Sequence, residues 1–96
     1  IFSTLCMGGS GAISAAAHVR TDRFVAMYRA CERGELIEAR RIFHELAPLV
    51  QALGTEPNPA PVKAALAGLG LLANELRAPM TRASSELGSR LAQWAA

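Results

Sequence analysis

"MGGSGAISAAAHV", residues 7–19, begins with a glycine-rich turn and continues as a run of small apolar residues. The part AISAAA, residues 12–17, is typical of a strand that is buried on both faces. A single strand leaves its backbone N–H and C=O groups unpaired, and the remaining sequence predicts no second strand. We therefore expect this strand to belong to a sheet whose other members lie outside these 96 residues.

The sequence on both sides of the strand predicts helices. IFSTLCM, residues 1–7, is expected to be the end of one helix. Another helix is expected to begin at Thr21 or Asp22, since either side chain can cap it, and to end near Gly34.

The segment 35–53 predicts the most regular helix, with a kink at Pro48. It carries one apolar stripe at spacings of three and four residues: Leu36, Ala39, Phe43, Leu46, Val50 and Leu53. Such a stripe packs in the protein core or against a partner helix.

Two proline-containing connectors divide the rest of the chain. TEPNPAP, residues 55–61, leads into a helix over 60–69, and its Pro61 suits a first helical turn. RAPM, residues 77–80, precedes a last helix that Ser84 or Ser85 caps. The bonds before Pro59 and Pro79 are candidates for cis peptides.

Composition excludes several classes of function. Ten basic and eight acidic residues give a net charge of +2, without the dense basic stripe that nucleic-acid binding requires. Residues 1–19 carry no charge, but GGSG (8–11) interrupts them, and no basic leading region precedes them. We therefore expect a single-domain cytoplasmic protein with no membrane segment. The lack of an initiating Met leads us to expect that the chain was cut from a longer one.

Few side chains have the spacing that catalysis or metal binding requires. Cys6 and Cys31 are far apart in sequence and form no C-x-x-C, so we expect two reduced thiols. His18 and His44 lack a neighbouring ligand, which argues against a metal site. A phosphate-binding G-x-G-x-x-G fails because Ser14 occupies its third glycine position.

Lys63 is the only lysine and directly follows the proline-rich connector. A lysine can form an imine with a carbonyl substrate if burial lowers its pKa. Because Lys63 lies near the start of a helix, where solvent usually reaches the ammonium group, we expect a structural or surface role.

Three segments resemble the dihydrodipicolinate synthase (4-hydroxy-tetrahydrodipicolinate synthase) family. Residues 7–19 resemble its G-G-x-G-x-I-S-V segment, EPNPAPVKAALAGLG (56–70) resembles its N-P-x-P-V-K motif, and LRAPM (76–80) resembles its R-L-P-M. The order and spacing also agree. The resemblance implies an α/β fold: the last strand of a (β/α)8 TIM barrel plus the C-terminal helical extension. Residues 1–20 are then the end of barrel helix seven and barrel strand eight, and 21–96 are the C-terminal helices of the same domain.

The resemblance also implies an activity. The family is a class of lyases that condense pyruvate with L-aspartate 4-semialdehyde in lysine and diaminopimelate biosynthesis, through a Schiff base on a lysine of the sixth strand. That strand precedes this chain, so no catalytic residue, cofactor or metal ligand is implied here, and the chain alone is expected to be inactive. Met7 and the helix around His44 fall in regions of subunit contact in tetrameric members, which implies a homo-oligomer.

Three residues carry over to the substrate pocket. Ile13 matches the isoleucine that contacts pyruvate in the family, and Gly11 and Ser14 flank it. Lys63 matches the lysine of N-P-x-P-V-K, which is not the nucleophile.

The chain also departs from the family pattern. Ala15, His18 and Ala78 stand where the family usually has a β-branched residue, asparagine and leucine. The aldehyde substrate is therefore open. The alternatives are another pyruvate-dependent aldolase on the same barrel, or a non-catalytic helical module whose apolar stripe binds a partner helix.

Overall fold

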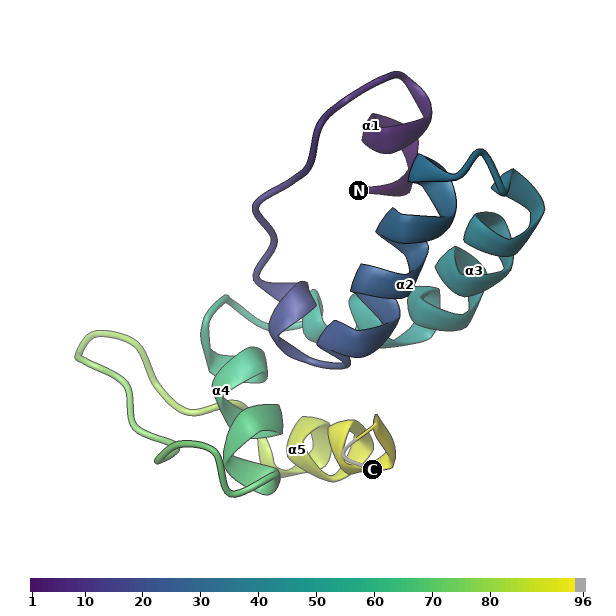
Figure 1. The fold of residues 1–96 in the computed structure, drawn as a ribbon. Coiled ribbons are helices and arrows are strands. Elements are labelled where there is room, and N and C mark those ends of the chain that lie inside the picture. The colour runs from purple at the N-terminus through teal and green to yellow at the C-terminus, as the bar shows by residue number, and fades with distance from the viewer. Residues whose placement is uncertain (95–96) are drawn as a thin grey trace.

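The computed structural model describes residues 1–94, which form a helical structure (Figure 1). The helices predicted from the sequence are all present. In chain order the elements are α1 (Phe2–Cys6), a 3₁₀ helix (Ala16–His18), α2 (Thr21–Glu32), α3 (Leu36–Leu53), α4 (Ala60–Gly68), α5 (Ser85–Leu91) and a second 3₁₀ helix (Ala92–Trp94).

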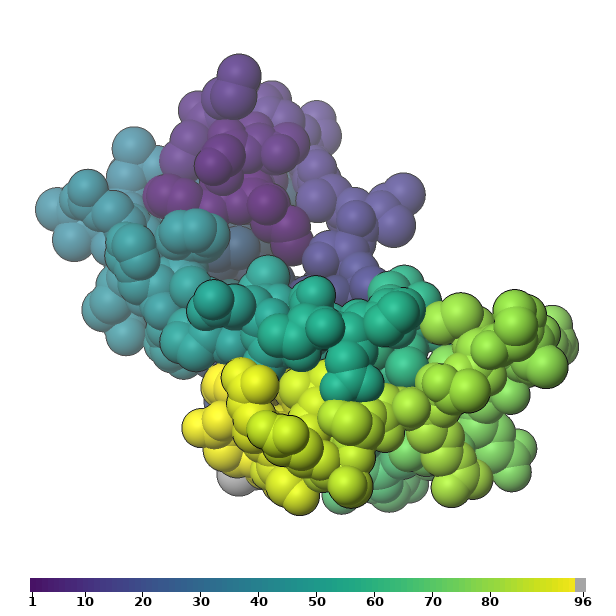
Figure 2. Space-filling view, turned by 180° about the vertical axis from the view of Figure 1, so that it is seen from behind, coloured from purple at the N-terminus to yellow at the C-terminus, as the bar shows by residue number. Residues whose placement is uncertain are grey.

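The helices pack in two groups. Helices α2 and α3 lie side by side, and α1 lies across both of them near one end (Figure 1). Helices α4 and α5 form the second pair, which joins the first where α5 contacts α3. From behind, α5 in yellow lies directly beneath the teal α3, and the green connector between α4 and α5 projects to one side (Figure 2).

The core is built by α2, α3, α4 and α5. Its largest fully buried side chains include Met27 of α2, Ile42 and Leu49 of α3, and Leu91 of α5. Because each helix contributes one apolar face to this core, burial of these side chains stabilises the arrangement.

The apolar stripe predicted on α3 is only half right. Ala39, Leu46 and Leu53 are buried as predicted, but three further members are exposed: Leu36 (52%), Phe43 (39%) and Val50 (43%). The buried face instead continues through residues 42, 49 and 52. The apolar arc of α3 is therefore wider than α2 and α5 cover, which leaves one apolar edge open.

The strand predicted over residues 12–17 is absent from the described part of the chain. Residues 9–14 have no regular secondary structure, and Ala16–His18 form the 3₁₀ helix. Within residues 1–94, the N–H groups of residues 10–15 donate to no backbone carbonyl. A strand forms only where a neighbouring strand supplies hydrogen-bond partners. Residues 1–94 contain no such neighbour.

The start of α2 also differs from the prediction. The residue before the helix is Arg20, in the left-handed conformation at φ 55°, and its guanidinium forms two hydrogen bonds to the Asp22 carboxylate. Thr21 donates its hydroxyl proton to the Ala17 carbonyl at 2.6 Å, so it ties α2 to the 3₁₀ helix instead of capping α2.

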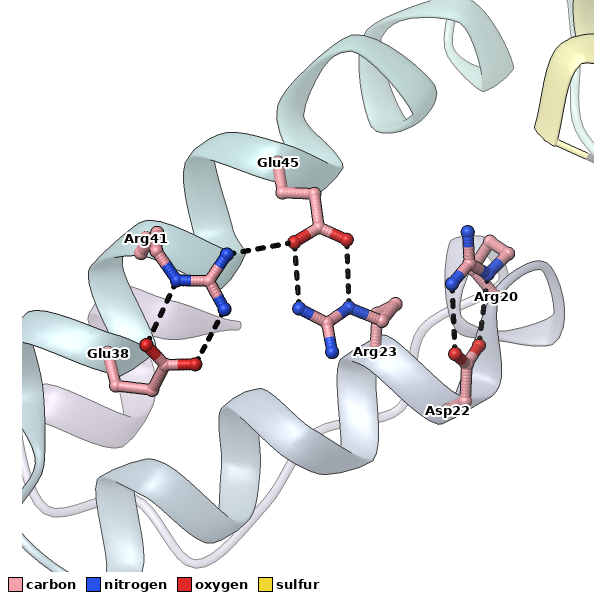
Figure 3. Close-up of polar contacts among 6 residues, drawn as sticks. All are labelled: Arg20, Asp22, Arg23, Glu38, Arg41 and Glu45. Carbon is pink, nitrogen blue, oxygen red and sulfur yellow. Dashed lines mark hydrogen bonds and ion pairs between the residues drawn. The ribbon is translucent and has the colours of Figure 1, made fainter.

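One ion pair joins α2 to α3 on the surface, and two further pairs lie within α3 (Figure 3). Arg23 donates two hydrogen bonds to the Glu45 carboxylate, at 2.8 and 2.7 Å. Arg41 pairs with Glu38 one turn earlier and lies 3.5 Å from Glu45. The hydrogen bonds from Arg23 are the main cause that lowers the pKa of Glu45. The Arg23–Glu45 pair therefore adds a surface contact between two helices whose packing rests mainly on the buried core.

Candidate functional site

The candidate substrate-binding segment, residues 7–15, leaves α1 through a tight turn. Gly8 adopts φ 94°, a conformation that glycine takes without strain. The Gly9 N–H donates to the Thr4 carbonyl at 2.9 Å. A Cβ atom on Gly9 would lie 2.6 Å from the Thr4 Cγ2 and 2.8 Å from its carbonyl oxygen. The glycine pair therefore serves to turn the chain back sharply before the extended part.

The three residues assigned to the substrate pocket do not meet in one cavity within residues 1–94. The Ile13 side chain is fully exposed, at 107% of its reference area. A Cβ atom placed on Gly11 meets nothing within 4 Å. Only Ser14 faces a concave surface. The assignment of Ile13, Gly11 and Ser14 to a pyruvate pocket stays a prediction.

The concave surface beside Ser14 is a groove of about 450 Å³ between α1, α2 and α3. Its walls are mostly apolar and include Phe2, Phe24 and Val50. The Phe2 and Phe43 rings stack there with centroids 5.2 Å apart, so α1 is held on α3 by an aromatic contact. The groove joins the exposed edge of α3 to the candidate substrate-binding segment.

The two proline motifs lie against each other. Pro59 and Lys63 of the first motif line the same hollow as Arg77 and Met80 of the second. Both X-Pro bonds that the sequence marked as candidates, Asn58–Pro59 and Ala78–Pro79, are cis. Residues of two separate motifs therefore build one local structure beside α4.

Lys63 links α4 to the connector that follows it. Its Nζ donates a hydrogen bond to the Glu75 carbonyl at 2.7 Å, twelve residues further along the chain. This hydrogen bond ties the connector after α4 to the helix. The geometry therefore agrees with the structural role expected from the sequence.

Glu56 of the first proline motif contacts Ser84, the residue that precedes α5, and this contact was not predicted from the sequence. Its carboxylate accepts hydrogen bonds from the Ser84 hydroxyl at 2.6 Å and the Ser84 N–H at 2.9 Å, and these lower the pKa of Glu56. The Ser84 hydroxyl oxygen also accepts from the Leu87 N–H, which confirms Ser84 as the cap of α5. Two features of the sequence could have suggested this contact: the acidic Glu56 at the start of the first proline motif, and Ser84 as a candidate cap of the last helix.

The histidines are not part of a shared site. His18 is exposed, and its Nδ1 lies 3.0 Å from the Ala15 carbonyl oxygen. His44 lies on α3 beside Phe43, with ring centroids 5.3 Å apart. Among residues 1–94, no three His, Cys, Asp or Glu side chains are grouped closely enough to hold a metal ion. No helix in this part of the chain has the length and apolar character needed to cross a membrane.

Comparison with known proteins identifies the family. The model of the dihydrodipicolinate synthetase family matches residues 1–95. The chain belongs to this family. The family resemblance inferred from the three sequence segments is thereby confirmed.

Similar proteins share both sequence and fold. The 4-hydroxy-tetrahydrodipicolinate synthase of Enterococcus faecalis is 43% identical over 90 residues, which is 94% of this chain and 31% of the relative. That of Thermosipho melanesiensis is 45% identical over 85 residues, covering 88% of this chain and 30% of the relative. The crystal structure of dihydrodipicolinate synthase from Thermotoga maritima matches with a TM-score of 0.91 and 39% identity, covering 96% of this chain and 31% of that one.

The chain thus spans about a third of the length of the proteins it matches. Dihydrodipicolinate synthase from Aquifex aeolicus matches over the same share, with a TM-score of 0.88. The predicted fold class, the last part of a TIM barrel with its helical extension, is confirmed by these neighbours, although the strand itself does not form within residues 1–94.

Proposed function

We propose that this chain is part of a longer 4-hydroxy-tetrahydrodipicolinate synthase, a Schiff-base-forming lyase that condenses pyruvate with L-aspartate 4-semialdehyde. The observation that carries the proposal is the family match across residues 1–95, combined with coverage of only about 30% of the similar synthases. The parent enzyme acts in lysine and diaminopimelate biosynthesis. The proposal places the catalytic lysine outside this chain.

In this proposal residues 1–20 contribute the end of barrel helix seven and barrel strand eight, and residues 21–96 are the helical extension of the same domain. The free N–H groups of residues 10–15 support this division, because a neighbouring strand would supply the acceptors that they lack. The exposure of Ile13 supports it too, since a large apolar side chain gains from burial in a completed barrel.

Ile13 then forms an apolar wall of the pyruvate pocket, with Gly11 and Ser14 beside it. An apolar wall excludes water from the carbon–nitrogen double bond that joins the lysine to pyruvate, and so protects the imine from hydrolysis. Gly11 has open space around its Cα, which allows substrate or another strand to approach the backbone. Lys63 and Glu56 keep the helical extension in shape.

The test is a steady-state assay of the longer polypeptide with pyruvate and L-aspartate 4-semialdehyde. Ile13→Ala is expected to raise the KM for pyruvate about tenfold, because methylene groups lost from an apolar pocket cost binding on this scale. Ile37→Ala is the matched control, since Ile37 is 79% exposed on α3. An equal KM for pyruvate in the two variants would show that Ile13 does not contact pyruvate. No turnover of pyruvate with any aldehyde would overturn the proposed function.

The first alternative is another pyruvate-dependent aldolase on the same barrel. It is favoured by Ala15, His18 and Ala78, which depart from the family pattern near and beyond the candidate segment. Comparing turnover of aspartate semialdehyde with that of sugar-acid products distinguishes the two enzymes.

The second alternative is a helical module without catalysis, and the exposed apolar residues Leu36, Phe43 and Val50 are the observation that favours it. A stable monomer of these 96 residues that unfolds cooperatively would support the module. Aggregation or a molten state would support the proposal that the chain is part of a longer barrel enzyme.

We further propose that the parent enzyme is cytoplasmic and assembles as a homodimer or homotetramer. The expected regions of contact are those around Met7 and His44, both exposed here. One matched structure is described as the first monomeric dihydrodipicolinate synthase variant, with a TM-score of 0.91, so the shared fold is compatible with more than one assembly. Sedimentation of the longer polypeptide measures its assembly directly.

A further inference from the structure

The fold brings together two cysteines that are 25 positions apart in the sequence. Cys6 is the last residue of α1, and Cys31 lies in the last turn of α2, which α1 contacts. Both are free thiols, with Cys6 exposed and Cys31 half-buried. Neither takes part in the site described above.

An open hollow of about 290 Å³ gives access to Cys31 from solvent. Cys31 lines it together with Leu5, the neighbour of Cys6, and with Tyr28 and Glu32 of α2. Gly9 and Ser10, from the glycine turn, complete the rim. The hollow therefore lies where α1, α2 and the candidate substrate-binding segment meet.

The two thiols differ in environment. Burial is the main cause that raises the pKa of Cys31, and the neighbouring Cys6 thiol raises it further. A raised pKa reduces the fraction of reactive thiolate, so Cys31 is slow to attack an oxidant. Cys6 is exposed and meets solutes first.

We propose that Cys6 and Cys31 form a reversible disulfide by exchange with a small-molecule disulfide such as oxidised glutathione. In the first step the Cys6 thiolate attacks one glutathione sulfur, and the glutathione S–S bond breaks to release one glutathione thiolate. In the second step Cys31 loses its proton and attacks the Cys6 sulfur, releasing the second glutathione. The two protein thiols are oxidised, and one glutathione disulfide is reduced to two thiols.

The bond would close a ring around the candidate substrate-binding segment. The residues between the two cysteines include Gly11, Ile13 and Ser14, as well as the 3₁₀ helix. Joining the ends of this stretch restricts its motion and locks α1 onto α2. The thiol pair itself does not depend on the proposed function.

The test titrates the reduced protein with oxidised glutathione at neutral pH, followed by acid quenching, alkylation and peptide mapping. Trypsin cleaves after Arg20, Arg29 and Arg33, so Cys6 and Cys31 fall in separate peptides. A disulfide between them is then detected as the summed mass of the two peptides. We expect the intramolecular cross-link to form in preference to stable glutathione adducts. The effective concentration of the two thiols should be at least about tenfold higher in the native protein than in urea, because folding holds them together.

Two variants show the order of the steps. Cys31→Ser is expected to stop at a stable glutathione adduct on Cys6, and Cys6→Ser to be modified slowly at Cys31. The rate of cross-linking should rise with pH, since the second step requires the Cys31 thiolate. A persistent adduct on Cys6 in the unaltered protein, a cross-link between two chains, or equal cross-linking in urea would overturn the proposal.

Discussion

The helices α2–α5 and the candidate substrate-binding segment differ in whether their backbone N–H groups find hydrogen-bond partners. The helices bond internally and share a core in which Ala39, Leu49 and Ala52 are fully buried. Residues 10–15 have no backbone acceptors for their N–H groups, and Ile13 lies fully in solvent. The stable part of this chain is therefore scaffold, and the part assigned to substrate depends on contacts that the scaffold does not provide.

This contrast follows from the physics of the two kinds of structure. A helix closes its hydrogen bonds within about four residues, so a helical extension keeps its structure when its surroundings change. A strand of a barrel takes every hydrogen bond from its neighbours. A residue on such a strand can be essential for binding without adding stability to this chain.

The largest expected effect separates the two regions directly. Leu49→Ala removes a fully buried side chain from the core and is expected to cost about 2–5 kcal/mol of unfolding free energy. Ile13→Ala, at the exposed site, is expected to change it by less than about 0.5 kcal/mol. Urea unfolding followed by circular dichroism measures both. A large loss for Ile13→Ala would show that the segment packs on the helices after all.

A smaller effect is expected where α5 is joined to the first proline motif. Ser84→Ala removes the cap of α5 and a hydroxyl donor to Glu56, and is expected to cost about 1 kcal/mol. Ser89→Ala is the matched control, because Ser89 is exposed in the middle of α5. If the two variants unfold alike, neither the cap of α5 nor the contact between Ser84 and Glu56 stabilises the scaffold.

The smallest effect is expected for the surface ion pair between α2 and α3. Glu45→Gln should cost about 0.2–1 kcal/mol, since both partners are partly exposed, and less at high salt. Because the pKa of Glu45 is lowered on folding, its contribution is full above the unfolded value of about 4.3 and is lost as the pH falls through the folded value.

The control for this pair is Glu75→Gln, since the Glu75 carboxylate forms no ion pair in the described part of the chain. Unfolding both variants between neutral and acidic pH compares them. A pH dependence that is unchanged by Glu45→Gln would assign the acid sensitivity to other carboxylates.

Much of the helical structure could be predicted from the sequence because its signals are local. Gly34 ends the turn after α2 with φ 73°, Pro61 lies in the first turn of α4, and Ser84 caps α5. The open edge of α3 could not be predicted, because Leu36 and Phe43 follow the same spacing as the buried residues and only the packing of α2 and α5 distinguishes them.

The contacts around the candidate site could be predicted less well from the sequence. The motifs indicated three separate segments, but the contact between Glu56 and Ser84 spans 28 positions. Cys6 and Cys31, whose thiols influence each other, are 25 positions apart. Such contacts depend on how the helices pack, which no local pattern specifies. The pyruvate pocket predicted around Ile13 stays a prediction, since the Ile13 side chain is fully exposed within residues 1–94.

The most direct test of the account is to incubate this chain and the longer polypeptide with pyruvate and borohydride, and to map the reduced imine by mass spectrometry. The account predicts no adduct on Lys63, whose amine donates to the Glu75 carbonyl, and a stoichiometric adduct on a lysine outside residues 1–96. Peptide mapping separates Lys63 from the N-terminal amine. A stoichiometric adduct on Lys63 would contradict the account and make the proline-framed lysine the catalytic amine.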